Sequence, residues 1–91
     1  MLHVRIFTKE GCPYSEGAKR LLHERGIRYE EIDVTGASER REDMLRETGG
    51  RGTTPQIFFG HRHIGGYDQL LALDRNEGVR AALGQADQPP A

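Results

Sequence analysis

Cys12, the single cysteine of the chain, is the residue best suited to do chemistry, and it lies within the sequence TKEGCPYS, residues 8–15. Pro13 suits the first position of a helix, because its fixed φ is already helical and its missing N–H would have no intrahelical partner. We therefore expect the Cys12 sulfur near the unpaired N–H groups of a helix start, where the helix dipole favours a negative charge. Lys9 adds a cation nearby. Both influences lower the pKa of a thiol from its free value of roughly 8.5, and they predict a reactive thiolate.

The alternative is that Cys12 is a small buried hydrophobic residue, as single cysteines often are. Its neighbours Gly11 and Pro13 leave little bulk to bury it. A turn between a strand and a helix also usually lies at the surface. These features favour a nucleophilic thiol over a structural one.

Strand and helix patterns surround this thiol. A strand is predicted directly before it, from the apolar residues Leu2, Val4, Ile6 and Phe7. A helix is predicted from Pro13 to about Arg25, before Gly26, and its apolar positions are Tyr14, Ala18, Leu21 and Leu22. Residues 27–34 have the pattern of a second strand, in which a phase slip predicts a bulge or an early end.

The second half of the chain begins with a predicted helix from about Ser38 to Thr48. It is rich in charges of both signs, so we expect a solvated lid that touches one face of a sheet through Met44, Leu45 and Thr48. The remaining elements are two antiparallel hairpin strands and two short helices, predicted at residues 56–59, 62–64, 67–73 and 77–83.

This order of elements is typical of an α/β fold. The first two strands should be parallel and joined by a right-handed helical crossover. We expect a small mixed sheet with helices on both faces. Residues 1–83 should form one domain, and residues 84–91, which lack core residues, a disordered C-terminal tail.

Composition narrows the classes of partner. The 91-residue chain has 13 Lys and Arg against 14 Asp and Glu, a formal net charge of -1, which favours neither nucleic acid nor an anionic membrane. It contains no run of 18 apolar residues and no signal-peptide pattern, so neither a membrane span nor secretion is predicted. A single cysteine cannot form an internal disulfide, and we expect a reducing, cytoplasmic environment.

Three segments of the sequence resemble the signature blocks of glutaredoxins. They are residues 8–15, 53–59 and 64–71, which match the family patterns C-P-Y-C, T-x-P-x-[IV]-F and G-G-x-D. The resemblance to the bacterial glutaredoxin 3 type extends from Leu2 to about Leu83. It implies a thioredoxin fold with a four-stranded mixed sheet of order 2-1-3-4, and a cis peptide bond before Pro55 that faces the thiol.

The resemblance also implies a binding site for glutathione, which would serve as co-substrate. Cys12 would be the nucleophile, and the Thr54-Pro55 backbone would pair with the cysteinyl part of glutathione. The remaining positions would hold the two charged ends: Lys9, Tyr14 and Gln56 the glycine carboxylate, and Gly66, Tyr67 and Asp68 the γ-glutamyl group. No metal ligand is implied among them.

The chain departs from the family pattern at three positions: Ser15 replaces the second cysteine, Thr54 occupies the middle of its block, and Gln69 replaces an acid. Ser15 matters most, because it cannot form a disulfide with Cys12. What remains is a monothiol route, in which Cys12 attacks a mixed disulfide at the glutathione sulfur and a second glutathione regenerates the thiolate. Glutathionylated proteins or small disulfides are the expected substrates.

Two other functions stay open. Some monothiol relatives bind a [2Fe-2S] cluster between two chains, using the cysteine and a glutathione from each, but those usually carry C-G-F-S. Pro13 is expected to disfavour such a dimer, so we expect a monomer. The second alternative is a glutathione-binding module without enzymatic activity.

His61 and His63 alternate in a predicted hairpin and would point to the same side. No third ligand is near them in the sequence, so they are interpreted as exposed strand histidines rather than a metal site.

Overall fold

The computed structural model describes residues 3–36 and 38–86 of the protein. Its elements in chain order are β1 (Val4–Thr8), α1 (Pro13–Glu24), β2 (Glu30–Asp33), α2 (Ser38–Thr48), β3 (Gln56–Phe59), β4 (Arg62–Gly65), α3 (Tyr67–Asn76) and α4 (Val79–Ala86). The strands form one mixed sheet in the order β2-β1-β3-β4. β1 and β2 are parallel, whereas β3 is antiparallel to both β1 and β4. The predicted α/β class and strand order are confirmed.

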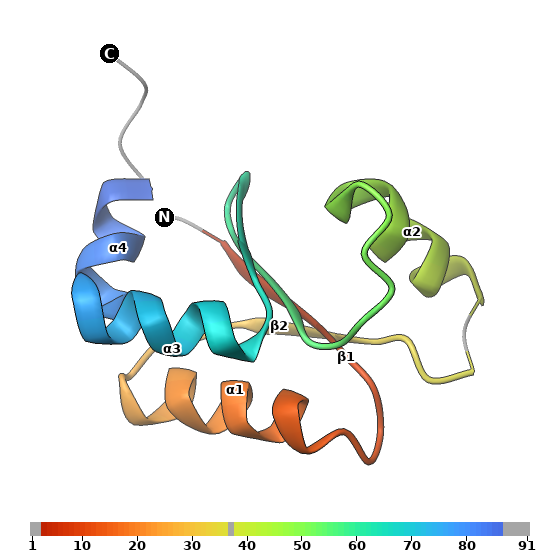
Figure 1. The fold of residues 1–91 in the computed structure, drawn as a ribbon, viewed down its shortest axis with the longest axis horizontal. Helices are drawn as coiled ribbons and strands as arrows, with labels where there is room; N and C mark the ends of the chain where they lie inside the picture. Colours follow the sequence, from red (N-terminus) through yellow and green to blue (C-terminus); the bar gives the residue numbers. More distant parts are fainter. Residues whose placement is uncertain (1–2, 37, 87–91) are drawn as a thin grey trace.

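The sheet is covered on both faces, and β1 is buried between the two layers. Because side chains alternate along a strand, Val4 and Ile6 face one layer and Phe7 faces the other. The larger layer contains α1, α3 and α4, whereas α2 lies on the opposite side of the sheet (Figure 1). Among the described helices, none is long and apolar enough to cross a membrane.

Helix α1 begins and ends where the sequence predicts. Its C-terminus closes with Gly26 at φ 72° and with hydrogen bonds from the Gly26 and Ile27 N–H groups back to the His23 and Leu22 carbonyls, at 3.0 and 2.9 Å. This pattern is a Schellman motif, in which glycine takes the left-handed position. Because the Ile27 N–H is used in the cap, the residue follows the helix instead of starting a strand.

Two details of the predicted first half are therefore corrected. β2 covers only Glu30–Asp33 and pairs with β1 without a register shift. Of the two predicted irregularities the strand shows the early end and not the bulge, and it starts at Glu30 instead of residue 27. On α1 the buried face contains Ser15, whereas Tyr14 is 62% exposed. Positions 14 and 15 both lie within one turn of the buried Ala18, so spacing alone does not choose between them, and it is the small Ser15 that faces inward.

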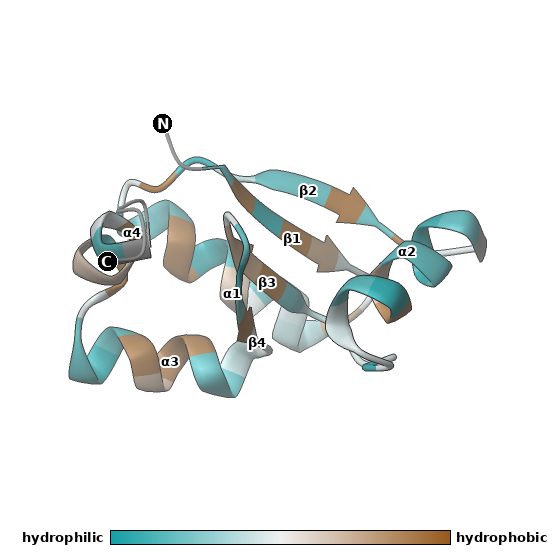
Figure 2. Ribbon diagram, turned by 90° about the horizontal axis from the view of Figure 1, so that it is seen from above, coloured by the Kyte–Doolittle hydropathy of each residue, from teal (hydrophilic) through white to brown (hydrophobic). Residues whose placement is uncertain are grey.

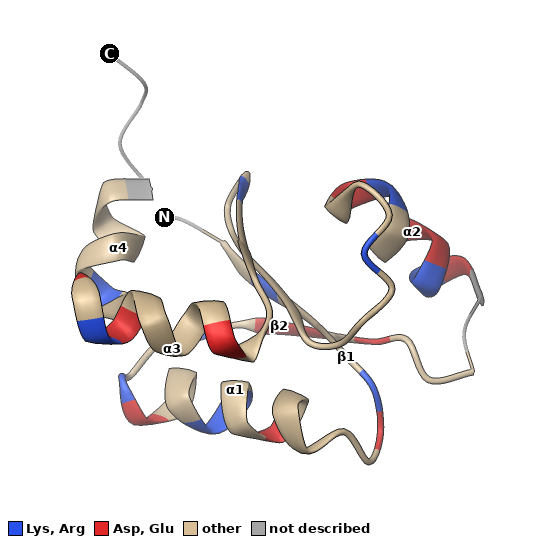
Figure 3. Cartoon of the chain, in the orientation of Figure 1, with Lys and Arg blue, Asp and Glu red and all other residues tan. Residues whose placement is uncertain are grey.

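Helix α2 is the predicted solvated lid. Met44 is its fully buried residue, and it packs with Phe7, Val34 and Phe58. The rest of the helix is mostly hydrophilic (Figure 2) and carries charges of both signs (Figure 3). One of these charges also contacts the sheet, because Glu47 pairs with Arg5 of β1 at 2.8 Å.

The two C-terminal helices are longer than predicted. α3 continues to Asn76 instead of Leu73, and α4 continues to Ala86, so residues 84–86 are helical and do not belong to the predicted tail. Residues 87–91 of that tail lie outside the described residues, and the division at residue 83 stays a prediction.

Candidate active site

Cys12 lies at the junction of the β1–α1 turn and the first turn of α1. It is the N-cap of the helix, with extended backbone angles, and its carbonyl accepts a hydrogen bond from the Glu16 N–H at 3.1 Å. Gly11 precedes it at φ 74°, a left-handed conformation that favours glycine. Pro13 opens the helix as predicted. The thiol is half-buried at this corner, and the predicted position over a helix start is confirmed.

Thr54 meets this thiol from the segment between α2 and β3. The Cys12 thiol donates to the Thr54 carbonyl at 3.6 Å, and the Thr54 hydroxyl donates to the sulfur at 3.5 Å. The Thr54-Pro55 peptide bond is cis, as the family resemblance implied. Cys12 and Thr54, which belong to two distant signature segments of the sequence, therefore lie in contact.

The surroundings of Cys12 lower its pKa below the ordinary value of a thiol. Burial raises the pKa, but hydrogen bonds from the Ser15 and Thr54 side chains and from the Ser15 and Tyr14 backbone N–H groups outweigh it. Ser15 is fully buried, and its hydroxyl has no hydrogen-bond partner among the described residues in the thiol form, so it is available to the thiolate. Lys9, which was expected to contribute, is exposed and is not among the causes of the shift. The activation comes from the helix start and Thr54.

The start of α3 packs beside this pair. A Cβ atom added at Gly66 would lie 3.4 Å from the Pro55 carbonyl oxygen, so the helix start approaches the Thr54-Pro55 segment closely. The Gly66 N–H donates to Gln69 Oε1 at 2.8 Å. This gives the departure from the family pattern at Gln69 a local role as a cap for α3. Asp68 is exposed in the first turn.

The two tyrosines of the predicted site come together across α1 and α3. The Tyr14 and Tyr67 ring centroids are 6.4 Å apart, with the planes tilted by 45°. The Tyr67 ring lies on Gly17, where an added Cβ atom would be only 2.9 Å from Cζ. Gly17 therefore leaves the space that the ring occupies beside the site.

Gln56 does not line the site, which corrects the prediction. Its side chain is fully buried and donates to the Thr53 carbonyl and hydroxyl at 3.0 and 3.2 Å. Its other end contacts His63, whose Nε2 lies 2.6 Å from Gln56 Oε1. The expectation that His63 is an exposed strand histidine is also wrong, because the ring is partly buried and stacks on Phe58 with centroids 4.7 Å apart. The alternation of Gln56 and Phe58 on one strand face was the available signal.

The protein was compared with known families, curated proteins and solved structures. The family model described as Glutaredoxin matches residues 4–64. The chain belongs to the glutaredoxin family. It is a glutathione-dependent thiol oxidoreductase with the thioredoxin fold, as the resemblance implied.

Individual relatives of this glutaredoxin agree with the family match. Glutaredoxin 3 of Escherichia coli (strain K12) is 46% identical over 83 residues, which cover 91% of this chain and 99% of the relative. The solution structure of a glutaredoxin from Brucella melitensis is 39% identical with a TM-score of 0.81, and the match covers 98% of this chain and 96% of that one. A buckwheat glutaredoxin–glutathione complex is 27% identical with a TM-score of 0.80, covering 93% and 79%.

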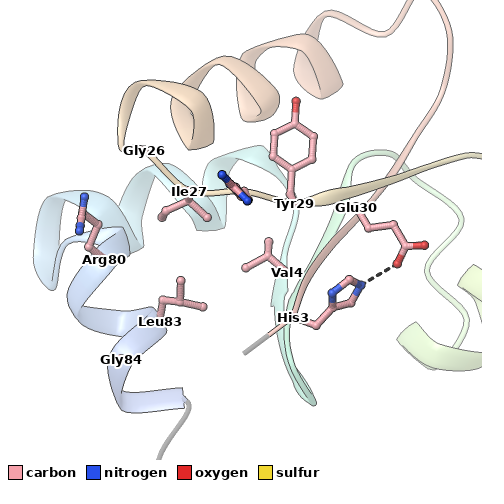
Figure 4. Close-up of a pocket in the computed structure, with 10 residues that line it drawn as sticks. His3, Val4, Gly26, Ile27, Tyr29, Glu30, Arg80, Leu83 and Gly84 are labelled. Atoms are coloured by element: carbon pink, nitrogen blue, oxygen red, sulfur yellow. Dashed lines mark hydrogen bonds and ion pairs between the residues drawn. The ribbon is translucent and has the colours of Figure 1, made fainter. Parts of the chain in front are cut away.

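A pocket of this glutaredoxin lies away from the thiol. It has a volume of about 640 Å³, and Val4, Ile27 and Leu83 point into it (Figure 4). Its lining also includes Gly26, which follows the end of α1, whereas Cys12 precedes the start of that helix. None of the predicted site residues lines this pocket.

Metal ligands do not cluster in the described part of this glutaredoxin. No three His, Cys, Asp or Glu side chains in residues 3–36 and 38–86 lie close enough together to hold an ion. The expectation that the protein has no metal site stays a prediction.

Proposed function

We propose that this glutaredoxin reduces glutathionylated thiols by a monothiol mechanism. The observation that supports it is the pairing of one activated cysteine, Cys12, with a buried serine at position 15. The Cys12 thiolate attacks the glutathione sulfur of a mixed disulfide. That disulfide bond breaks, and the substrate leaves as a thiolate that takes a proton from water. Cys12 now carries glutathione in a new disulfide.

A second glutathione completes the cycle. Its thiolate attacks the glutathione sulfur of the Cys12 adduct, which releases glutathione disulfide and returns the Cys12 thiolate. Ser15 cannot release glutathione from Cys12 in place of the second glutathione, because a neutral hydroxyl does not displace a thiolate from a disulfide. Its hydroxyl instead donates a hydrogen bond to the departing or attacking Cys12 thiolate. The adduct therefore persists until a second glutathione arrives.

Glutathione is proposed to lie along the Thr54-Pro55 backbone, with its ends on either side. Lys9 and Tyr14 would meet the glycine carboxylate at one end. The γ-glutamyl carboxylate suits the first N–H groups of α3, after Gly66, because a helix start attracts anions. Within that turn Tyr67 would pack against the ligand and Asp68 would pair with its ammonium group. Gln56 is left out of this set, because it is buried.

The proposed reaction needs no second chain. We infer a cytoplasmic monomer that acts on glutathionylated proteins or small disulfides. Anaerobic incubation with iron, sulfide and glutathione should leave the protein colourless and monomeric by sizing, because Pro13 opens α1 rigidly at the thiol. A stable coloured dimer would contradict this state.

Mass spectrometry and a turnover assay test the cycle directly. Incubation with oxidised glutathione should add one glutathione per chain, and Cys12→Ser should abolish both the adduct and the reduction of a glutathionylated peptide. If the wild-type chain formed the adduct but did not turn over, the proposed cycle would be wrong.

The role of Asp68 is tested by removing its charge. Asp68→Asn should lower kcat/KM for a glutathionylated peptide by about tenfold, the scale of one partly solvated charge-assisted hydrogen bond. The matched control is Asp43→Asn on α2, an exposed acid that pairs with Arg46. Equal losses in both variants would show a general charge effect instead of recognition.

The role of position 15 is tested by Ser15→Cys. This variant should gain reduction of a protein disulfide and keep the reduction of glutathionylated peptide, since only the first reaction needs a resolving thiol. Equal rates of protein-disulfide reduction in the wild type and Ser15→Cys would contradict the assigned role.

A further inference from the structure

A chain of hydrogen bonds on the α2 side of the sheet connects β4 to the segment that contacts the thiol. His63 Nε2 lies 2.6 Å from Gln56 Oε1, and Gln56 Nε2 donates to the carbonyl and hydroxyl of Thr53. Thr53 directly precedes Thr54, whose carbonyl and hydroxyl contact the Cys12 sulfur. The sequence did not predict these hydrogen bonds, because His63 was interpreted as exposed and Gln56 as a ligand-binding residue.

The direction of every hydrogen bond in the chain follows from chemistry. The Thr53 carbonyl can only accept, so the Gln56 amide nitrogen must face it. The Gln56 carboxamide oxygen therefore faces His63, and since it too can only accept, His63 must carry a proton on Nε2. Burial and the nearby Arg51 lower the pKa of His63, which favours the neutral ring. Adding a second proton at Nδ1 would leave the Nε2–H donor in place.

Packing holds the ring of His63 in the orientation that this donor needs. The ring stacks on Phe58 with an angle of 18° between planes. The other neighbours of Phe58 fix it in turn, because Phe7 meets it edge-on at 6.1 Å and the Arg5 guanidinium lies 4.9 Å from its ring centroid. The orientation of the His63 Nε2–H group is thus fixed by side chains that pack between the sheet and α2.

The segment that receives this support has no regular structure of its own. Residues 49–55 connect α2 to β3, and Gly49 and Gly50 have φ values of 73° and 104°. Its first residues are held to the end of α2, where the Gly50 N–H donates to the Leu45 carbonyl at 2.8 Å and the Arg51 N–H donates to the Thr48 hydroxyl at 2.9 Å. At Thr53 the Gln56 side chain donates one hydrogen bond to the backbone carbonyl and one to the hydroxyl.

We propose that His63 is a positioning residue for the Cys12 nucleophile. Through Gln56 it holds Thr53, and so keeps the Thr54 hydroxyl within reach of the sulfur. This inference rests on the proposed function, because it assumes that Cys12 is the reacting group. It assigns to β4 a role in catalysis that acts through the side chain of Gln56.

Two substitutions of His63 separate the donor from the ring. His63→Phe keeps a ring for stacking on Phe58 but removes the donor, whereas His63→Gln keeps an N–H at the position of Nε2 and removes the ring. Iodoacetamide alkylation of Cys12 against pH is the measurement. His63→Phe should raise the midpoint by about half a pH unit, the size of losing one weak hydrogen bond to the thiolate, and His63→Gln should restore it. The matched control, His61→Phe at the exposed turn, should leave it unchanged.

Other patterns of alkylation overturn the proposal. A shift in His63→Gln with none in His63→Phe would assign the effect to ring packing. A shift in both variants, or in neither, would show that the donor does not determine the state of the thiol.

A spectroscopic measurement on the unchanged protein covers the case in which His63→Phe does not fold. Long-range proton–nitrogen NMR spectra should show His63 as the Nε2–H tautomer at neutral pH, and the Nδ1–H tautomer would overturn the proposed chain. Neither this measurement nor alkylation requires glutathione. A wild type with an activated thiol but no turnover would therefore defeat only the proposed function, whereas normal turnover without the predicted shift would defeat only this inference.

Discussion

The Thr54 hydroxyl provides the sharpest test of how the thiol is activated. Thr54→Val removes the donor that lies 3.5 Å from the Cys12 sulfur, and it keeps the β-branched shape. It also keeps the Thr54 carbonyl, which accepts from the thiol at 3.6 Å and so favours the protonated form. Because a lost donor destabilises the thiolate more than the neutral thiol, the substitution should raise the pKa of Cys12.

The size of the increase can be estimated from the geometry. A hydrogen bond to a charged group contributes about 1.5–3 kcal/mol when it is well formed and buried. Sulfur is a weak acceptor and this site is half exposed, so we take roughly 0.7 kcal/mol. At about 1.36 kcal/mol per unit, the pKa should increase by about 0.5. Below the midpoint, the thiolate fraction and the alkylation rate should then fall about threefold.

The assay is the rate of iodoacetamide alkylation as a function of pH. Thr54→Ser serves as the control, because it retains the hydroxyl and should keep a midpoint close to the wild type. An unchanged or lowered midpoint in Thr54→Val would refute the reasoning, and it would leave the N–H groups and Ser15 at the start of α1 as the source of activation.

Three further predictions concern stability, each measured by urea unfolding. Gly17→Ala should destabilise the protein by about 1–3 kcal/mol despite the better helix propensity of Ala, because the new Cβ would overlap Tyr67 Cζ at 2.9 Å; a stabilised variant would show that the ring moves freely. Met44→Ala should cost about 2–5 kcal/mol through the cavity left under α2, and a cost below 1 kcal/mol would mean that the lid is not held by this contact. Asp74 accepts from Arg25 at 3.1 and 2.8 Å, and these hydrogen bonds hold its pKa below the usual value. The stabilising effect of the ionised Asp74 is therefore present above its unfolded pKa of about 3.9 and is lost as the pH falls through the lower folded pKa. Asp74→Asn should destabilise the protein at neutral pH and much less in strong acid. A loss of stability that does not depend on pH would contradict the pairing of Asp74 with Arg25.

Features that depend on local rules were predictable from the sequence. Pro13 after Cys12 and Gly26 after Arg25 set the two ends of α1, because helix termini have short-range requirements for φ and for N–H and C=O partners. The contact between Cys12 and Thr54 was expected only through the family resemblance, since 42 residues separate them.

Features that depend on distant partners were missed. Gln56 was interpreted as a ligand-binding residue because its buried partner, His63, lies on the next strand, and only the register of β3 with β4 brings them together. Hydrophobicity selected Tyr14 for the inner face of α1, but the thiol beside it needs a small neighbour, and Ser15 takes that place. Gln56 is thus buried where the partners of its side chain lie, on Thr53 and His63, which a single sequence does not reveal.

The tyrosine pair beside the thiol gives this glutaredoxin an optical signal of its own. The chain has no tryptophan and three tyrosines, of which Tyr14 and Tyr67 lie with ring centroids 6.4 Å apart at the site. Two of the three emitting rings therefore lie close together across α1 and α3, and one of them, Tyr14, is two residues from Cys12 in the first turn of α1. The third, Tyr29, lines the pocket at the other end of α1 and supplies an internal baseline. We expect the tyrosine emission to change when Cys12 acquires glutathione, so that a single turnover is followed without a label or an added chromophore.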